Sequence, residues 1–461
     1  MSRAIPVTLL GLLLLLPAVG RADDGSVDLQ GLIDDADPGS TLTLESGTHA
    51  GGVTIDKPLT ISGTDGTVID GGGSGTVIKV TAPDVTLKHL VIRGSGASLD
   101  REDSGISANA PRVTITDNLF EDVLFGIFAR SAENSVISGN VVGAKDVFIA
   151  NRGDGIRLFE SEDSIVTDNT ISGGRDTVFW FTDRVVVKGN EISDGRYGLH
   201  FMYSDGATIE QNILTRNSVG AFMMYSRDVT VRDNVMAENF GPSGYGLGLK
   251  DMDRVAVEGN RFIGNRVGMY FDNTPYSHDE FEYIIGNLFA YNRTGVVLQP
   301  SVKRNVFSGN AFIDNAEQVG VQGTGSFSGN EWSMDGVGNY WSDFAGYDAD
   351  GNGIGDVSYL ADDLYNTLSN SYPELQFYQE TPAARAITIA AEMFPVLRPR
   401  PLVEDAFPLV DQPNIQTAGF AETTSLSRAL LLTSVVMLAA AAGAVFLPSP
   451  RRRRHQPGSP A

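Results

Sequence analysis

The chain of 461 residues contains no cysteine, and only seven of its 34 basic residues are lysine. The absence of cysteine excludes a disulfide framework and every metal site that is built on thiolates. Positive charge is also scarce, because 57 acidic residues leave a formal net charge of −23. Such a surface repels nucleic acid and anionic lipid, so we expect neither of them as a partner.

Both ends of the sequence carry signals for export or for membrane attachment. An apolar run followed by small residues at a cut after Ala22 predicts a secretory signal peptide over residues 1–22, with an uncleaved anchor as the alternative. Residues 429–447 are 19 residues without a charge, long enough to span a bilayer as a helix. Arginines in the tail 448–461 should hold that tail in the cytoplasm. We therefore predict an extracytoplasmic protein, in the periplasm or on the outer cell surface, anchored to the cytoplasmic membrane by its C-terminal helix.

A short segment of β-type sequence that ends in asparagine recurs along the chain every 20 to 29 residues. Its β-branched, alternating character indicates short strands and not the helices of a tetratricopeptide repeat. Asparagine at such a turn tolerates a left-handed backbone and can hydrogen-bond along a stack of its own kind. The pattern predicts an all-β fold, a single-stranded right-handed parallel β-helix over residues 23–380. The repeated asparagines are Asn118, Asn140, Asn169, Asn190, Asn212, Asn234, Asn260, Asn287, Asn310 and Asn330.

A second strand, usually opened by glycine, lies upstream of the asparagine in each repeat. Alternation directs the first and third residues after the opening position to the core, and the second and fourth outward. The outward residues predicted in this way are Phe128, Arg130, Arg157, Phe159, Val178, Trp180, His200, Met202, Phe222, Met224, Gly248, Lys250, Tyr270 and Asp272.

The middle of this outward face carries aromatic rings, thioethers and one imidazole, where a soluble solenoid should be polar. Met202 and Met224 are predicted one turn apart, and His200 lies two residues from Met202 on the same face. Imidazole and thioether are neutral donors that suit Cu(I). The same residues also suit the docking of a partner, or packing under a loop. The candidate copper-binding or docking residues are His200, Met202, Met224, Phe222, Tyr203 and Tyr225.

Carboxylate chemistry, as in solenoid polysaccharide lyases and hydrolases, is the competing use of such a face. Lys250 and Asp272 share a column on adjacent turns, whereas Arg157 lies four turns away from Lys250. We expect no second carboxylate beside this pair, which favours a structural ion pair. The sequence therefore predicts no multi-carboxylate cluster and no catalytic residue.

The segment DADGNGIGD has the ligand spacing of an EF-hand loop. Side-chain oxygens at positions 1, 3, 5 and 9 and a carbonyl at position 7 suit a structural calcium ion. Tyr359 stands at position 12, where a glutamate is usual, so we expect modest affinity. A plain turn is the alternative. The candidate calcium ligands are Asp348, Asp350, Asn352, Ile354 and Asp356.

The region after the repeats changes character. Thr381 as the N-cap and Pro382 at the first helical position predict an amphipathic helix over residues 381–395. Residues 396–428 are rich in proline without a period, which predicts an extended linker to the membrane.

The segments GDGIRLFES, GRYGLHFMYS and GAFMMYS, followed by GNYWSDFAGYDADGNGIGD, closely resemble the NosD family of nitrous oxide reductase maturation proteins, over about residues 25–395. The resemblance implies an extracytoplasmic, copper-binding β-helix that is not an enzyme. It implies a role in assembling the copper–sulfur centre of nitrous oxide reductase. The implied partners are the permease and ATPase of an ABC transporter, the reductase and a copper chaperone. The predicted anchor over 429–447 departs from the usual soluble periplasmic member.

Two other classes of function stay open from the residues alone. A carbohydrate-active β-helix enzyme, a lyase or hydrolase, would need a carboxylate cluster on the outward face. A surface solenoid for carbohydrate binding or adhesion would leave the histidine and methionines without a role.

Overall fold

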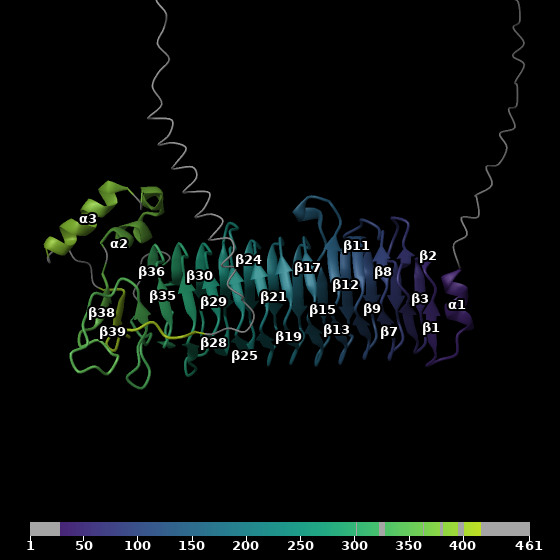
Figure 1. Cartoon of the computed structure of the whole chain (residues 1–461), viewed down its shortest axis with the longest axis horizontal. Coiled ribbons are helices and arrows are strands. Elements are labelled where there is room, and N and C mark those ends of the chain that lie inside the picture. The colour runs from purple at the N-terminus through teal and green to yellow at the C-terminus, as the bar shows by residue number, and fades with distance from the viewer. Residues whose placement is uncertain are drawn as a thin grey trace, which may run out of the picture. The chain divides into compact units, whose positions relative to one another are not determined.

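The computed structural model describes residues 28–300, 302–321, 328–362, 364–378, 381–394 and 401–415, all within one compact unit. Its body is a parallel β-helix in which each turn, here called a rung, adds one strand to each of three sheets (Figure 1). The predicted fold, a right-handed parallel β-helix, is confirmed. The predicted signal peptide (1–22), membrane helix (429–447) and basic tail (448–461) lie outside the described residues. Within the described ranges, no helix is long and apolar enough to cross a membrane.

Three long sheets run along the stack, and a short fourth one closes it. The first sheet contains β1 (Thr41–Leu44), β4 (Thr60–Gly63), β7 (Thr86–Lys88), β10 (Thr114–Thr116), β13 (Val136–Ser138), β16 (Ile165–Thr167), β19 (Val186–Lys188), β22 (Thr208–Glu210), β25 (Arg227–Arg232), β28 (Asp253–Glu258), β31 (Glu282–Ile285) and β34 (Asn305–Ser308). The second contains β2 (Gly47–Ala50), β5 (Thr67–Asp70), β8 (Val91–Arg93), β11 (Leu119–Val123), β14 (Val141–Ala144), β17 (Thr170–Ser172), β20 (Glu191–Ser193), β23 (Ile213–Thr215), β26 (Val235–Ala237), β29 (Arg261–Ile263), β32 (Leu288–Ala290), β35 (Ala311–Ile313) and β37 (Tyr340–Trp341). The third contains β3 (Val53–Ile55), β6 (Ile78–Val80), β9 (Ser104–Ala108), β12 (Phe125–Arg130), β15 (Ile156–Phe159), β18 (Asp176–Trp180), β21 (Tyr197–Met202), β24 (Val219–Met224), β27 (Tyr245–Lys250), β30 (Val267–Asp272), β33 (Thr294–Leu298) and β36 (Glu317–Val321). The fourth pairs β38 (Tyr359–Ala361) with β39 (Val403–Asp405).

Alternation within each strand produces the core. In β15, Ile156 and Leu158 are fully buried, while Arg157 and Phe159 between and after them are partly exposed. Equivalent residues of successive rungs stack on one another, as the rings of Phe179 and Phe201 do at 4.6 Å. Because every rung repeats this pattern, one apolar core runs the length of the stack.

A ladder of buried asparagines follows one turn of the β-helix. The side chain of Asn212 accepts from the backbone N and Nδ2 of Asn190 at 2.9 and 3.0 Å, and its Nδ2 donates to Asn234 Oδ1 at 3.0 Å. The left-handed residue of this turn is the one before the asparagine, such as Asp168 (φ 55°) or Gly189 (φ 65°), and not the asparagine itself. The members are Asn118, Asn140, Asn169, Asn190, Asn212, Asn234, Asn260, Asn287, Asn310 and Asn339.

The prediction that Asn330 is the last member of that ladder was wrong. Asn330 accepts from Asn305 in a different column, whereas Asn339 accepts from Asn310 and continues the ladder. A second ladder of hydrogen-bonded asparagines was not predicted from the sequence. It consists of Asn217, Asn239, Asn265, Asn292 and Asn315.

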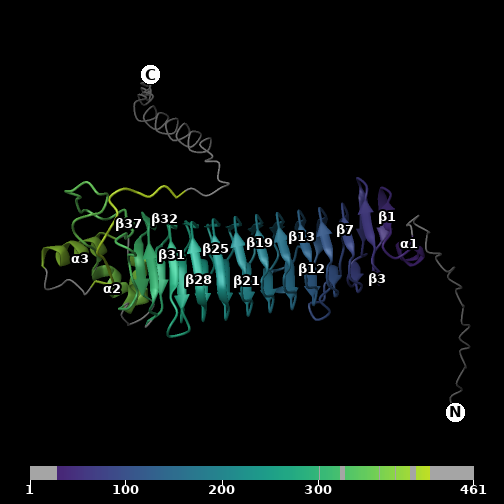
Figure 2. The ribbon, with the colours of Figure 1, turned by 90° about the horizontal axis from the view of Figure 1, so that it is seen from below.

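The two ends of the stack are closed differently (Figure 2). At the amino-terminal end, α1 (Leu29–Asp35) covers the first rung and Asp28 caps it by accepting from Gly31 N at 3.1 Å. After β37 the regular stack stops, before residue 380 where the predicted β-helix ended. There follow β38, α2 (Leu364–Ser371), the 3₁₀ helix η2 (Pro373–Tyr378) and α3 (Pro382–Met393). Another 3₁₀ helix, η1 (Ile149–Asn151), lies in the longer loop between β14 and β15.

Part of the segment predicted as a linker, 396–428, is built into this end. Within it β39 pairs with β38, and the side chain of Asp405 is fully buried. Asp405 Oδ2 accepts from the backbone N of Asn339 at 2.7 Å and from Nε1 of Trp341 at 2.9 Å. The last rung would otherwise leave these donors unpaired, so a carboxylate from the supposed linker ends the asparagine ladder.

Candidate functional site

The predicted outward face assembles on β21 and β24 of the third sheet. Met202 is directly opposite Met224, and His200 is opposite Phe222. Met202, Met224 and Phe222 are half-buried. The rings of Tyr203 and Tyr225 stack at 5.0 Å, and both side chains are exposed. All six candidate residues therefore lie on two adjacent rungs.

Several outward positions are less exposed than their alternation predicts. Phe128, Val178, His200 and Tyr270 are all below 8% exposed, although the three apolar ones lie outside the continuous core. Large side chains on the same face cover them. The guanidinium carbon of Arg157, for example, lies 5.1 Å from the ring centroid of Phe128. The outer face of the third sheet is thus a second packed layer, which strand alternation alone does not predict.

His200 is enclosed within this layer and is only 6% exposed. The ring of Trp180, from the preceding rung, meets the imidazole edge-to-face with centroids 5.4 Å apart. The ring of Tyr197 does the same at 4.9 Å. The imidazole therefore lies between two aromatic side chains and not in open solvent.

A buried carboxylate fixes the orientation of that imidazole. Asp176 Oδ2 lies 3.3 Å from His200 Nδ1, and Arg196 donates to both carboxylate oxygens. Burial alone would raise the pKa of Asp176, but hydrogen bonds from His200 and Arg196 hold it below its usual value. Because Nδ1 contacts the carboxylate, Nε2 is the ring nitrogen that remains for another partner. That Nε2 is buried and has no hydrogen-bond partner among the residues that the structure describes.

Asp176 occupies a position where other rungs have glycine. A Cβ on Gly198 would lie 2.4 Å from the carbonyl oxygen of Gly220, so the usual strand opening has no room for a side chain. In β18 the register shifts instead, with Asp176 opposite Tyr197 and Val178 opposite His200. This irregularity makes room for the carboxylate. The exception to the glycine pattern was the signal by which the sequence could have revealed Asp176.

A second buried carboxylate, Asp154, lies near Asp176. Burial raises the pKa of Asp154 to about 7, and the negative charge of Asp176 adds to that shift. Arg157 Nη1 lies 3.8 Å from Asp154 and 3.8 Å from Glu102. The expectation that this face has no multi-carboxylate cluster was wrong, because both aspartates lie outside the two outward columns that alternation identified. Their exposed fractions are 7% and 4%, so neither is open to a polymer.

Lys250 and Asp272 form the predicted ion pair, with Nζ and Oδ2 2.6 Å apart. The expectation that no second carboxylate lies beside this pair was wrong, because Asp251 Oδ2 lies 3.6 Å from Lys250 Nζ. The hydrogen bond to Asp272 raises the pKa of Lys250. Beside them the rings of Tyr245 and Tyr270 stack at 4.3 Å, and burial raises the pKa of Tyr245 to about 12. The arrangement is that of a structural pair on a packed surface.

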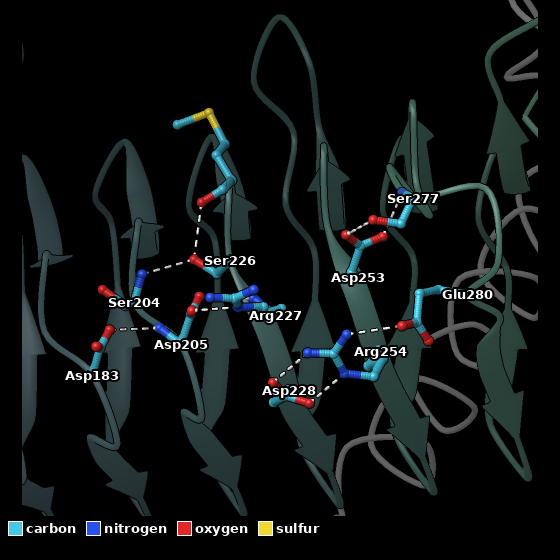
Figure 3. Close-up of polar contacts among 11 residues, drawn as sticks. Asp183, Ser204, Asp205, Ser226, Arg227, Asp228, Asp253, Arg254, Ser277 and Glu280 are labelled. Carbon is cyan, nitrogen blue, oxygen red and sulfur yellow. Dashed lines mark hydrogen bonds and ion pairs between the residues drawn. The ribbon is translucent and has the colours of Figure 1, made fainter.

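The turns that follow β21 and β24 are joined to each other through Ser204 and Ser226 (Figure 3). The hydroxyl of Ser226 accepts from Ser204 N at 2.9 Å and donates to the carbonyl of Met224 at 3.0 Å. Next to Tyr203 and Tyr225 lies an open groove of about 620 Å³. It is further lined by Asp183, Asp205, Ser226, Arg227, Asp251, Asp253 and Tyr276.

The predicted calcium loop uses its carboxylates on its own backbone. Asp348 accepts from the amides of Gly351 and Gly353 at 2.7 and 2.8 Å, and these bonds lower its pKa. Asn352 Oδ1 accepts from Ile354 N, and Asp356 Oδ2 from Ala349 N. Asp350 Oδ2 accepts from Asn352 Nδ2. Across the described part of the chain, no three His, Asp or Glu side chains are grouped as ligands of one ion.

Comparison with known proteins gives consistent matches. The family described as "Periplasmic copper-binding protein (NosD)" matches residues 138–346. A "Probable ABC transporter binding protein NosD" from Pseudomonas aeruginosa is 33% identical over 424 residues, covering 89% of this chain and 96% of that protein. The protein of the same name from Stutzerimonas stutzeri is 29% identical, covering 87% and 93%.

Solved β-helices are similar in fold. The mannuronan C-5 epimerase AlgE6 A-module of Azotobacter vinelandii is 15% identical and has a TM-score of 0.48, with 68% of this chain and 96% of that one covered. The tailspike gp61 of Pseudomonas phage phi297 is 11% identical and has a TM-score of 0.49, with 68% and 72% covered. These scores carry no information about chemistry.

Proposed function

The chain belongs to the NosD family, and from that premise we propose that it is a non-enzymatic accessory protein for the maturation of nitrous oxide reductase. In this role it assists the assembly of the reductase's copper–sulfur centre together with an ABC transporter. Its own contribution is to hold or hand over copper on the outer face of the third sheet. The family description as copper-binding and the relatives' description as transporter-binding support the proposal.

The observation that carries the copper part is the state of His200. Its Nε2 is buried and without a hydrogen-bond partner in the described structure, while its Nδ1 faces the carboxylate of Asp176. A carboxylate on the far nitrogen is the usual support of a metal-binding histidine. Met202 and Met224 lie opposite each other on the same face. One imidazole nitrogen and two thioethers fit Cu(I) better than Ca²⁺ or Zn²⁺.

A carbohydrate-active enzyme is the second candidate, favoured by the carboxylates Asp154 and Asp176. Acid–base work on a sugar requires that such groups reach the substrate. Here both are enclosed, and Asp176 is occupied by Arg196 and His200. The cluster therefore suits the support of His200 better than hydrolysis or elimination.

The proposal extends to partners and location. The permease and ATPase of the transporter, the reductase and a copper chaperone are the proposed partners, in the periplasm or on the outer cell surface. Exposed apolar side chains on η2 and at the end of α3, Phe377, Met393 and Phe394, offer a surface for the transporter. Residues 429–447 are the proposed anchor, and the loop 348–356 the proposed structural calcium site.

A Cu(I) titration against a competing chelator, performed without oxygen, tests the copper assignment. The wild-type ectodomain should bind about one ion, and Met202→Leu with Met224→Leu should lose it while keeping the fold, because the exchange conserves volume. The matched control is Met223→Leu with Met269→Leu, two fully buried methionines on the core side of the same sheet. Unchanged copper affinity in the first variant would refute the ligand assignment. If that variant also matured the reductase while Phe222→Ala did not, the face would be a docking surface.

A further inference from the structure

Trp180 continues the methionine column by one rung. It pairs in register with Met202, which in turn pairs with Met224, so an indole and two thioethers follow one another along the outer face. The indole is half-buried and meets the imidazole of His200 edge-to-face at 5.4 Å. The indole and the imidazole are therefore in direct contact within the packed layer.

The ring of Trp180 already accepts one cation. The guanidinium carbon of Arg157 lies 5.0 Å from its centroid, and Arg157 belongs to the preceding rung, on the side away from His200 in the stack. Glu102 and Asp154 lie near this guanidinium, each 3.8 Å from Arg157 Nη1, and Glu102 opposes its charge. The indole thus lies between the guanidinium of Arg157, whose positive charge Glu102 partly offsets, and the imidazole of His200. Nε2 of that imidazole has no hydrogen-bond partner among the described residues.

Polar atoms on this face are left without partners. His200 is 94% buried, and neither its Nε2 nor Nε1 of Trp180 bonds to any described residue. A buried polar group without a hydrogen-bond partner destabilises the folded chain. Cores rarely keep such groups without a use for them.

We propose that Asp176 and Trp180 complete the copper site. Asp176 is a positioning residue whose Oδ2, 3.3 Å from Nδ1 of His200, fixes the orientation of the ring and leaves Nε2 as the nitrogen for the ion. Trp180 is a specificity residue whose ring faces the ion, favouring a monovalent soft cation and shielding it from water. The inference rests on the proposed copper function, because it assigns further residues to the same site.

The small number of tryptophans makes indole fluorescence a direct reporter of the environment of Trp180. The chain has three tryptophans, and the other two, Trp332 and Trp341, lie at the carboxy-terminal end, stacked on Phe307 and Phe312. A change of indole emission that comes from Trp180 can therefore be separated from the rest by a single variant.

The experiment is a Cu(I) titration of the wild-type protein followed by tryptophan fluorescence and, in parallel, by chelator competition. We expect Cu(I) to quench emission at one equivalent. Trp180→Phe should abolish that quenching and weaken Cu(I) binding by roughly three- to tenfold. Tyr197→Phe, which changes the other ring against His200, is the control and should keep the quenching.

Asp176→Asn tests the positioning role, with Asp154→Asn as the control for a nearby buried aspartate. Loss of such a supporting carboxylate should weaken Cu(I) binding about 10- to 100-fold. It should also change the imidazole ¹⁵N spectrum of metal-free His200, which a merely structural role would not do. Melting temperatures show whether each variant is folded.

The outcomes separate the two proposals. If the wild-type protein binds Cu(I) but Trp180→Phe keeps the same quenching and affinity, the assignment of Trp180 is overturned and the copper function stands. If Asp176→Asn binds copper as the wild type does, the positioning role is overturned. If the folded wild-type protein binds no Cu(I), the proposed function and this inference fall together.

Discussion

Two columns of polar side chains pass through the rungs from β18 to β24: the asparagine ladder and the outer face of the third sheet. They differ in how far their hydrogen-bonding groups are paired. In the asparagine ladder, Asn190 and Asn212 each bond to the rungs before and after them and to backbone carbonyls. On the outer face of the third sheet, the nitrogens His200 Nε2 and Trp180 Nε1 have no partner in the described structure. The repeating fold therefore satisfies the polar groups that hold it together. The unpaired nitrogens of His200 and Trp180 lie together on adjacent rungs of the outer face, where we propose the copper site.

Each column also contains a buried carboxylate, and the two carboxylates have different structural roles. The ladder ends on the buried carboxylate of Asp405, which accepts from Asn339 and Trp341 and thereby closes the stack. The carboxylate of Asp176 instead lies at a break in the strand register, where it contacts the imidazole of His200 and accepts from Arg196. Asp405 closes the asparagine ladder, whereas Asp176 lies where the register between two strands shifts.

The largest expected effect is on the ladder side of this comparison. Asn212→Ala should lower the free energy of unfolding by on the order of 5 kcal/mol, because it leaves several buried donors and acceptors unpaired at once. His200→Leu loses one polar contact, from Nδ1 to Asp176, and that carboxylate keeps its bonds from Arg196, so the cost should be about 2 kcal/mol. Denaturant unfolding of both variants measures the difference. Equal losses would show that the two columns are not distinct.

The asparagine spacing was sufficient to predict the β-helix, but not how its last rung is closed. The spacing of Asn118 to Asn310 predicted the stack, because each rung repeats the same buried turn. It misplaced the final asparagine, since only the folded chain shows that Asn339 and Asp405 meet across 66 residues.

For the site, alternation identified His200, Met202 and Met224 correctly as neighbours on one face. It missed Asp176 and Asp154, which precede the regular strand positions. It also overestimated exposure, because a packed outer layer depends on how long side chains such as Arg157 lie across their neighbours. Strand periodicity contains no information of that kind.

A pH titration tests buried carboxylates that lie outside the asparagine ladder, with a smaller expected effect. The folded-state pKa of Asp154 is about 7, raised by burial from an ordinary value of 3.8. Its contribution to stability is fully present below about pH 4 and is lost as the pH rises through 7, at most about 4 kcal/mol. Asp154→Asn should therefore flatten the fall in melting temperature between pH 5 and 8. Glu282, whose pKa is raised to about 8, adds a fall of the same sign that Glu282→Gln should remove. A melting temperature independent of pH in the wild type would contradict both values.

The smallest expected effect is at the calcium loop, which lies beyond the last rung. If DADGNGIGD holds calcium, a concentration ten times the Kd should stabilise the protein by about 1.4 kcal/mol. Chelation should then lower the melting temperature. Asp348→Ala with Asp350→Ala should abolish that response, because both side chains are candidate ligands at the start of the loop. No shift with chelator in the wild type would leave only a turn.

The most direct test of the central claim is X-ray absorption of the protein loaded with one equivalent of Cu(I). If the unsatisfied face is the copper site, the spectrum should show one nitrogen from His200 and two sulfurs from Met202 and Met224 around the ion. The sulfur contribution should disappear in Met202→Leu with Met224→Leu and persist in Met223→Leu with Met269→Leu. A wild-type spectrum with oxygen and nitrogen neighbours alone would contradict the claim.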